Sequence, residues 1–343
     1  MHDSGNRRSG NTVAWITLGV LVVIIVAAIA LDWNRIRPVL RSANWHLLLP
    51  AVALAFASYA CSGLAAALIN RVFGLPGPLR RLFLVGFVTM AVNNLITLAG
   101  AAAYGVSAVL LRRRDIKLSD ILAASVFNTY LHFLVGTTFL PLALLYLVLS
   151  GRLAPRVATG LSVVTGAATI AAVLLNVMVL SGRVRRAVFG FMRRLVRLVT
   201  RRDAAESFGN FDAAFTHGER MLRARPGAAA GIAALVAADW SACILALWSC
   251  TAAFGAAPSL VTTASGFFVA IAAGGASMLP GGLGVQDGSM AGVYALLGMP
   301  LEQALLASVL FRAVYYFLPF LAGLVIYWRV LREHWTASGP PES

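Results

Sequence analysis

Three ionisable side chains stand inside long apolar stretches. Asp239 lies within AALVAADWSACILALW, and Arg312 lies within LLASVLFRAVYYFLPFLAGL. Asp287 follows a Pro-Gly-Gly break in GGASMLPGGLGVQDGSMAG. A charge at the centre of a bilayer costs about 2.5–3.5 kcal/mol on insertion scales, so each needs a reason. A guanidinium grips phosphate oxygens as a fork and stays charged. We therefore expect a polar cavity in which Arg312 binds a phosphate and the carboxylates face an amine or polar headgroup.

A structural interpretation stays open for these residues. Asp239 and Arg312 could form an ion pair that only ties two helices together. Weaker polar candidates are Asn93, Asn94, Asn128 and His132, for which interhelical hydrogen bonding is the commoner role. The aromatic residues Tyr315, Tyr316 and Phe317 could pack against lipid or, as a sharper hypothesis, form one wall of an acyl-chain groove.

Composition decides the fold class. Of 343 residues 59% are hydrophobic and 12% are charged, more apolar surface than a soluble domain can bury. Apolar runs of about 20 residues predict an all-α polytopic membrane protein, read as one membrane domain over 1–343. The net charge of +15 falls between these runs, where positive-inside topology explains it, so no nucleic acid partner is expected. Cys61, Cys243 and Cys250 lie within the runs as core thiols.

Six runs are predicted to cross once and two to form broken re-entrant hairpins. The crossing runs are 11–31, 46–70, 118–149, 157–180, 228–254 and 301–328. The runs 82–111 and 259–298 are too long for one crossing and contain small or helix-breaking residues, which buried or cavity-lining backbone tolerates. A tilted continuous span at 82–111 stays open as the alternative.

Charge placement orients these runs. We read 11–31 as an uncleaved signal anchor in a bacterial inner membrane, with both termini in the cytoplasm. The basic clusters then share the cytoplasmic side: Arg7/Arg8, Arg71/Arg80/Arg81, Arg112/Arg113/Arg114/Lys117, the loop at 181–227, and Arg329/Arg332. Five arginines fall on the other side against the rule: Arg35, Arg37, Arg41, Arg152 and Arg156.

The two hairpins resemble each other. A shift of 183 residues places KLSDILAASVFNTYLHFLVG (117–136) over PLEQALLASVLFRAVYYFLP (300–319) and NLITLAG over SMLPGGL. The matches without a gap are Leu118/Leu301, Leu122/Leu305, Ala124/Ala307, Ser125/Ser308 and Val126/Val309. Chance matching of small apolar residues is the alternative. Hairpins that enter from opposite faces indicate an inverted repeat, the arrangement in which broken helices of transporters form a substrate site.

The loop at 181–227 opens with RVRRAVFGFMRRLVRLVTRR, an amphipathic basic pattern. Such a helix is expected at the membrane interface against anionic lipid headgroups, although its charges also serve topology. The interface residues are Arg183, Arg186, Arg193, Arg194 and Arg197. The chain contains no Gly-rich phosphate loop, HExxH or GxSxG motif, and no acidic pair at metal-ligand spacing. We expect no enzyme, cofactor or metal.

At LPGGLGVQDGSMAGVYALLGMPLEQALLASVLFRAVYYFLPFLAGL the sequence resembles the membrane flippase domain of the lysylphosphatidylglycerol synthase/flippase family. The shared pattern is a Pro-Gly-Gly-Leu-Gly break, an acid, then Arg followed by aromatic residues and Pro. Asp287 stands where the family usually has Glu, and Leu98 and Ala99 replace a Pro-Gly break that the family often has in the first hairpin. No segment resembles the family's soluble aminoacyl-transferase domain, so we expect that this chain does not charge lipids.

The resemblance implies translocation of a phospholipid, aminoacylated in many members, or of another polar lipid between leaflets. The residues expected at the substrate are Asp239, Asp287, Arg312, Pro280, Gly281, Gly282, Gly284, Asn93 and Asn94. The alternative is an accessory membrane protein that scaffolds a glycosyltransferase or lipid-synthesis enzyme through the basic loop. A second copy of the chain or such an enzyme stays open as a partner.

Overall fold

The structure is a computed structural model that describes residues 33–337, apart from 96–100, 112–117, 185–186, 189, 192–212, 214–215, 222 and 278. The predicted signal anchor at 11–31 lies outside the described residues. All the secondary-structure elements in the described part of the chain are helices. These are α2 (Trp33–Ser42), η1 (Trp45–Leu47), α3 (Leu48–Val72), α4 (Leu79–Leu95), α5 (Ala101–Leu111), α6 (Leu118–Leu149), α7 (Pro155–Leu180), α10 (Pro226–Ala253), α11 (Leu260–Ala276), η2 (Pro280–Gly282), α12 (Val285–Leu296), α13 (Leu301–Phe311), η3 (Arg312–Phe317) and α14 (Leu318–Ala337).

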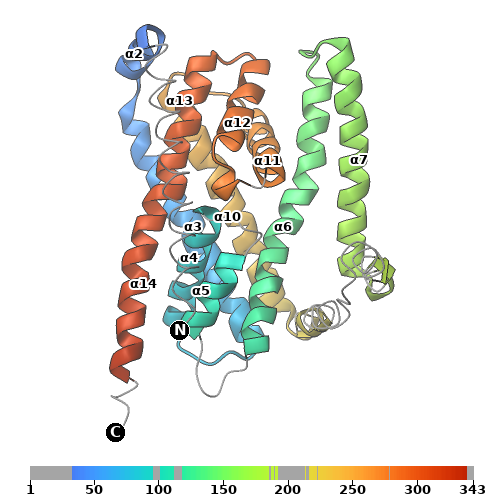
Figure 1. Cartoon of the computed structure of the whole chain (residues 1–343), viewed down its shortest axis with the longest axis vertical. Helices are drawn as coiled ribbons and strands as arrows, with labels where there is room; N and C mark the ends of the chain where they lie inside the picture. The colour runs from blue at the N-terminus through green and yellow to red at the C-terminus, as the bar shows by residue number, and fades with distance from the viewer. Residues whose placement is uncertain are drawn as a thin grey trace, which may run out of the picture.

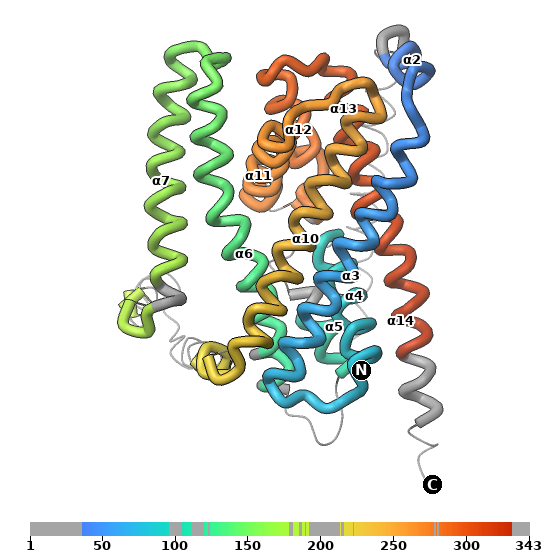
Figure 2. The backbone as a smooth tube through the Cα atoms, turned by 180° about the vertical axis from the view of Figure 1, so that it is seen from behind, coloured from blue at the N-terminus to red at the C-terminus, as the bar shows by residue number. Residues whose placement is uncertain are grey.

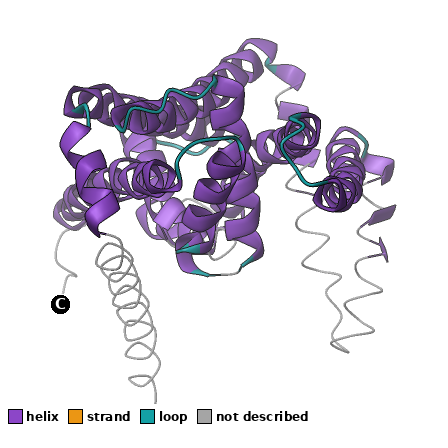
Figure 3. Cartoon of the chain, turned by 90° about the horizontal axis from the view of Figure 1, so that it is seen from above, coloured by secondary structure: helices purple, strands orange, loops and turns teal. Residues whose placement is uncertain are grey.

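Five stretches of the described chain are long and apolar enough to cross a membrane. They are Trp45–Val72, Asp120–Leu149, Pro155–Val177, Pro226–Ala253 and Leu301–Val330. Each coincides with a run predicted to cross once, which confirms an all-α polytopic membrane protein. Seen from above, the helices gather in one bundle with the α6–α7 pair at its side (Figure 3).

Both long runs fold back on themselves. The first is built from α4 and α5, which contact each other, and the second from α11 and α12, joined by the short turn η2. The α4–α5 hairpin lies in the lower half of the molecule and the α11–α12 hairpin in the upper half (Figures 1 and 2). The hairpins therefore enter from opposite ends, and α4 contacts η2 and η3 where they meet. The alternative of a continuous span at 82–111 is wrong, because α4 ends at Leu95 and α5 returns beside it.

Among the described residues, the basic residues near the helix ends are grouped in the way that the predicted topology groups them. The lower end of the molecule carries the α3–α4 turn with Arg71, the end of α7, the start of α10 and the far end of α14 with Arg329 (Figure 1). The upper end carries α2 and the α6–α7 turn with Arg152. The exceptions to the positive-inside rule thus share one end. That the lower end faces the cytoplasm remains a prediction.

The order of elements repeats along the chain. Helices α3, α4, α5 and α6 correspond to α10, α11, α12 and the combined α13–α14 helix. Leu118 begins α6 and Leu301 begins α13, 183 residues later, which is the shift that aligns the sequences. One difference stands out: α6 runs unbroken through Pro141, whereas Arg312–Phe317 between α13 and α14 is a π-helix. The repeated order supports the inverted repeat.

Close helix contacts fix the first hairpin against the bundle. A Cβ atom on Gly86 of α4 would lie 2.7 Å from the carbonyl oxygen of Gly63 in α3 and 2.8 Å from Cβ of Ala66. Only a residue without a side chain permits this approach, which is how membrane helices pack closely. Around it lies an apolar core that includes Leu82, Val85 and Ile121.

Candidate functional site at the meeting of the two hairpins

The second hairpin reverses at a glycine turn. Gly281, Gly282 and Gly284 have φ of +61°, +60° and +76°. Side chains with a Cβ avoid this left-handed region, so glycine is the residue that lets the chain turn between α11 and α12. Pro280 begins the turn and cannot extend α11 through it. The predicted break is therefore confirmed and falls on the predicted residues.

Asp287 anchors the start of α12 and forms an ion pair. Its Oδ2 accepts a hydrogen bond from the backbone N–H of Gly284 at 3.2 Å, which satisfies a donor at the helix N-terminus. Its Oδ1 accepts from Nε of Arg312 at 2.7 Å. The side chain of Asp287 is 16% exposed. One carboxylate thus holds both the turn and the cation.

Arg312 opens the π-helix and points back at the glycine turn. Nη1 donates to the carbonyl oxygen of Gly281 at 3.1 Å, and the guanidinium lies over the ring of Tyr316 with Cζ 5.2 Å from its centroid. The side chain is only 6% exposed. Its Nη2 is buried and has no hydrogen-bond partner among the described residues. The cation therefore keeps one donor atom for a further acceptor.

The first hairpin reaches the same place. A Cβ atom on Gly281 would lie 2.8 Å from the carbonyl oxygen of Leu95, the last residue of α4. Asn94, one residue earlier, donates from Nδ2 to the hydroxyl of Tyr59 at 3.0 Å, and Asn93 is half-buried beside it. The end of α4 carries partial negative charge because its last carbonyls lack helical partners. The two hairpin tips thus meet next to Arg312.

A second polar cluster surrounds Asp239, which is 2% exposed in the middle of α10. Ser58 hydrogen-bonds both Oδ1 of Asp239 and the hydroxyl of Tyr315, the latter at 2.8 Å. Oδ2 of Asp239 lies 3.1 Å from Nε2 of His132, and that nitrogen lies 3.2 Å from Oγ of Ser62. Helices α3, α6, α10 and the π-helix each contribute a group.

The structure separates the three predicted ionisable residues. Asp287 and Arg312 pair at the glycine turn, whereas Asp239 contacts His132. The alternative of an ion pair between Asp239 and Arg312 is wrong. The π-helix explains why the two groups are separate. Within it, Tyr315 bonds to the Asp239 cluster, whereas Tyr316 lies under Arg312. The hydroxyl of Tyr316 also accepts a hydrogen bond from Nε2 of Gln286 at 2.7 Å.

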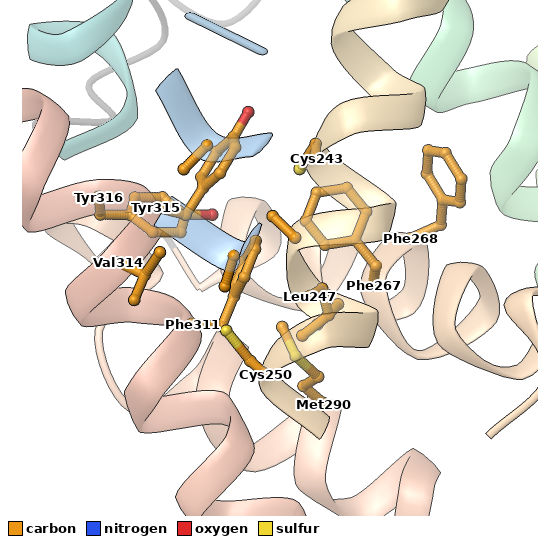
Figure 4. Close-up of a cluster of buried hydrophobic side chains, with 14 of the residues drawn as sticks. Cys243, Leu247, Cys250, Phe267, Phe268, Met290, Phe311, Val314, Tyr315 and Tyr316 are labelled. Carbon is orange, nitrogen blue, oxygen red and sulfur yellow. The ribbon is translucent and has the colours of Figure 1, made fainter. Parts of the chain in front are cut away.

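The aromatic group does not face lipid. Tyr315 is 4% and Tyr316 7% exposed, and Figure 4 shows both beside Phe311, with Cys243 of α10 nearby. Packing against lipid is therefore wrong for both tyrosines. Neither lines the large apolar cavity, and a role as one wall of an acyl-chain groove stays a prediction. That cavity, of about 460 Å³, lies between α6, α10 and α11, where Phe139, Ile232 and Phe268 are part of its wall.

The interface helix falls largely outside the described residues, which include Arg183 but not Arg186, Arg193, Arg194 or Arg197. Arg183 is exposed, and Phe191 is 65% exposed. Among the residues that the structure describes, no group of three or more His, Cys, Asp or Glu could hold a metal ion.

Sequence reasoning missed Ser58 and Gln286 and ranked His132 as a minor candidate. A single serine or glutamine in an apolar helix gives little signal, because such residues usually bond their own helix backbone. His132 has a stronger signal: an imidazole within an apolar run needs a polar partner, and Asp239 is an acid within another apolar run.

Comparison with known proteins agrees with this architecture. The family described as "Lysylphosphatidylglycerol synthase TM region" matches residues 16–323. Curated relatives named phosphatidylglycerol lysyltransferase, from Staphylococcus aureus strains COL and MSSA476, are each 32% identical over 88 residues; that of strain MRSA252 is 31% identical over 88 residues. These matches cover 26% of this chain and 10% of each relative. The family match covers most of the chain, including both hairpins, so the chain belongs to the family of lysylphosphatidylglycerol synthase transmembrane regions.

Proposed function

We propose that this chain moves a polar lipid, such as a phospholipid with or without an aminoacyl group, between the leaflets of a bacterial inner membrane. The lower end of the molecule would face the cytoplasm, and the headgroup would pass Arg312 and Asp287 where the hairpin tips meet. The proposal assigns the chain no enzymatic step, because the named activity of its relatives belongs to proteins of which the match covers a tenth.

The observation that carries the proposal is the unused donor of a buried cation. Arg312 donates from Nε to Asp287 and from Nη1 to Gly281, while Nη2 has no partner among the described residues. A buried donor without an acceptor lowers the stability of the folded protein by about 1–3 kcal/mol. A phosphate oxygen is the acceptor that a guanidinium binds best. A passing phospholipid headgroup would supply it.

The position of the pair suits a transport path. Arg312 and Asp287 do not face acyl chains, because their side chains are 6% and 16% exposed. The pair is also not fully enclosed, since Asp287 keeps part of its surface open. Glycine backbone and the end of α4 surround it, and such segments can separate with little loss of side-chain packing. In the described conformation, here called closed, the hairpin tips are in contact, and translocation would require that they move apart.

Fluorescent-lipid translocation in proteoliposomes tests the proposal. Purified protein should move a headgroup-labelled phospholipid from the inner to the outer leaflet faster than protein-free vesicles do. Arg312→Ala should slow the movement by about a hundredfold. Arg223→Ala is the matched control, because Arg223 is 73% exposed and forms a surface ion pair with Glu219 one turn earlier. Thermal unfolding of each variant checks that it folds.

The accessory role makes the opposite prediction. A scaffold for a lipid-synthesis enzyme would move no lipid when purified, and its function would be lost when the loop arginines are neutralised. Lipid movement that Arg223→Ala retains and Arg312→Ala loses excludes a pure scaffold. Absence of movement by the folded wild-type chain would overturn the proposed transport.

A further inference from the structure

The pair of Asp239 and His132 is a second ionisable site that the headgroup path does not use. It lies on α10 and α6, and its polar contacts run to α3 and the π-helix. The side chain of Asp239 is 3% exposed and that of His132 is 13% exposed. Arg312 is bonded to Asp287 and shares no hydrogen bond with this pair.

The contacts of His132 fix the number of protons at the pair. Nδ1 lies 3.0 Å from the backbone carbonyl oxygen of Asn128, which can only accept, so Nδ1 carries a proton. Nε2 lies 3.1 Å from Oδ2 of Asp239. A hydrogen bond there requires one more proton, on Nε2 or on Oδ2. In both arrangements the pair has zero net charge.

Removal of that shared proton leaves a negative charge in the interior. The groups that face the pair from α3 are Ser58, Ser62, Tyr59 and Cys61; from α10, Cys243; and from the π-helix, Tyr315. Each is neutral when it keeps its own proton. Among the described residues His132 is the only cationic partner of Asp239. The deprotonated pair is therefore unfavourable while it stays enclosed, because a buried carboxylate without a counter-charge is strongly destabilised.

A small polar cavity next to the pair has room for water. It measures about 20 Å³ and lies between α3, α4, α5 and α6, with Asn70, Thr89, Ser107, Ser125 and Asn128 in its wall. A single water needs about 10–15 Å³ and two or more polar partners. Oδ1 of Asn128 is buried and has no hydrogen-bond partner among the described residues. Asn128 thus lies in the wall of this cavity and also bonds His132, through its backbone carbonyl, so the cavity is one residue away from the pair.

We propose that Asp239 and His132 form a binding site for one proton, and that loss of this proton favours opening of the closed conformation. In the step, the shared proton passes to a water molecule, Nδ1 keeps its own proton, and the pair changes from zero to one negative charge. No electron is transferred. The site stands independently of lipid transport, and only its coupling to opening rests on the proposed function.

Nitrogen NMR of the full chain in lipid nanodiscs tests the site. The chain has five histidines, so the His132 signal is identified by its loss in His132→Gln. Between about pH 5 and about pH 9, a range around the ordinary histidine value, the wild type should release one proton from the pair. In Asp239→Asn, His132 should stay neutral with Nδ1 protonated throughout. An unchanged His132 signal in the wild type, or the same titration in Asp239→Asn, overturns the proposal.

Translocation against pH tests the coupling. The wild-type rate should rise with pH, by at most about tenfold per pH unit as expected for one proton, and the rate of Asp239→Asn should be independent of pH. A pH-independent wild-type rate overturns the coupling. If the folded wild type moves no lipid at any pH, the proposed transport fails, while the NMR titration still decides whether the proton site exists.

Discussion

The two halves of the molecule use one arrangement of helices for different chemistry. In the second half, Asp287 and Arg312 form an ion pair at a glycine turn. The positions 183 residues earlier hold Tyr104 and Thr129, which line the small polar cavity beside the first hairpin. The scaffold thus accommodates neutral polar groups in one half and charges in the other. At Arg312 the backbone break supplies an extra acceptor for the charge, the carbonyl oxygen of Gly281.

The π-helix sharpens the difference. Helix α6 is continuous over Leu118–Leu149, so its polar residues His132 and Asn128 bond within the helix and to α10. In the second half the wider turn Arg312–Phe317 directs Tyr315 and Tyr316 to separate polar clusters. π-Bulges in helices frequently mark functional sites. The asymmetry between otherwise corresponding helices is one reason to place the proposed headgroup contact in the second half.

The largest effect on the translocation rate should appear when residues at corresponding positions of the two halves are each replaced by alanine. Arg312→Ala removes the cation and leaves Asp287 without its partner, so translocation should fall by about a hundredfold, equivalent to about 3 kcal/mol. Thr129→Ala in the first half should change the rate by less than about twofold, within the scatter of about 0.5 kcal/mol for mild substitutions. Equal losses in the proteoliposome measurement would contradict the asymmetry.

Replacing the glycines of the break with alanine should lower the unfolding free energy by different amounts, depending on what the added methyl group contacts. Gly281→Ala introduces a Cβ 2.8 Å from the Leu95 carbonyl oxygen, whereas Gly284→Ala meets nothing within 4 Å. Both have positive φ, which costs about 1–2 kcal/mol for alanine. We expect Gly281→Ala to lose about 1–3 kcal/mol more unfolding free energy than Gly284→Ala, because the hairpin tips must separate. Equal unfolding midpoints in detergent would show that the tips do not touch.

A side chain added where the first hairpin contacts α3 should lower the stability of the protein by a similar amount. Gly86→Ala forces α4 away from Gly63 and should destabilise the protein by about 1–3 kcal/mol. Gly105→Ala in α5 is the matched control, because nothing lies within 4 Å of the added methyl group. It should stabilise by up to about 1 kcal/mol through helix propensity. Thermal unfolding of both variants measures the difference, and a neutral Gly86→Ala would refute the close approach.

The smallest expected effects on stability come from replacing the two tyrosines of the π-helix with phenylalanine. Tyr316→Phe keeps the ring under Arg312 but removes the acceptor for Gln286, and Tyr315→Phe removes the hydroxyl bonded to Ser58. Each should cost about 1 kcal/mol of stability, the usual net value of a buried hydrogen bond. Tyr315→Phe should also alter the nitrogen NMR titration of His132, whereas Tyr316→Phe should leave it unchanged.

Length and hydropathy predicted most of the fold, because a bilayer imposes the same constraint on every crossing. The run 259–298 was read as a hairpin from Pro280 and the following glycines, whose backbone preferences are local. The run 82–111 has no Pro-Gly-Gly break, so its sequence leaves a tilted span open. The position of its hairpin depends on the contact between Gly63 and Gly86, which lie on different helices.

The pairing of charges could not be read from the sequence. Burial cost identified Asp239, Asp287 and Arg312, but which acid meets Arg312 depends on the rotation of each helix about its axis. A π-helix that begins at Arg312 changes that rotation, and no residue type in the sequence predicts a π-helix. The choice of His132 as partner for Asp239 likewise depends on the packing of α6 against α10 and α3.

Thiol accessibility beside the ion pair reports whether headgroups can reach it. Ser308 is 1% exposed and donates to the backbone carbonyl of Asp287 at 3.1 Å, so Ser308→Cys places a thiol next to the pair. Ser42→Cys, on the exposed upper helix α2, is the control for one face, and the unsubstituted chain corrects for Cys61, Cys243 and Cys250. If the pair lies on a lipid path, a membrane-impermeant thiol reagent should label Ser308→Cys slowly from both faces of oriented proteoliposomes, and Ser42→Cys rapidly from one. A folded Ser308→Cys protein that stays unlabelled from both faces, or is labelled from one face alone, would contradict transport past this pair.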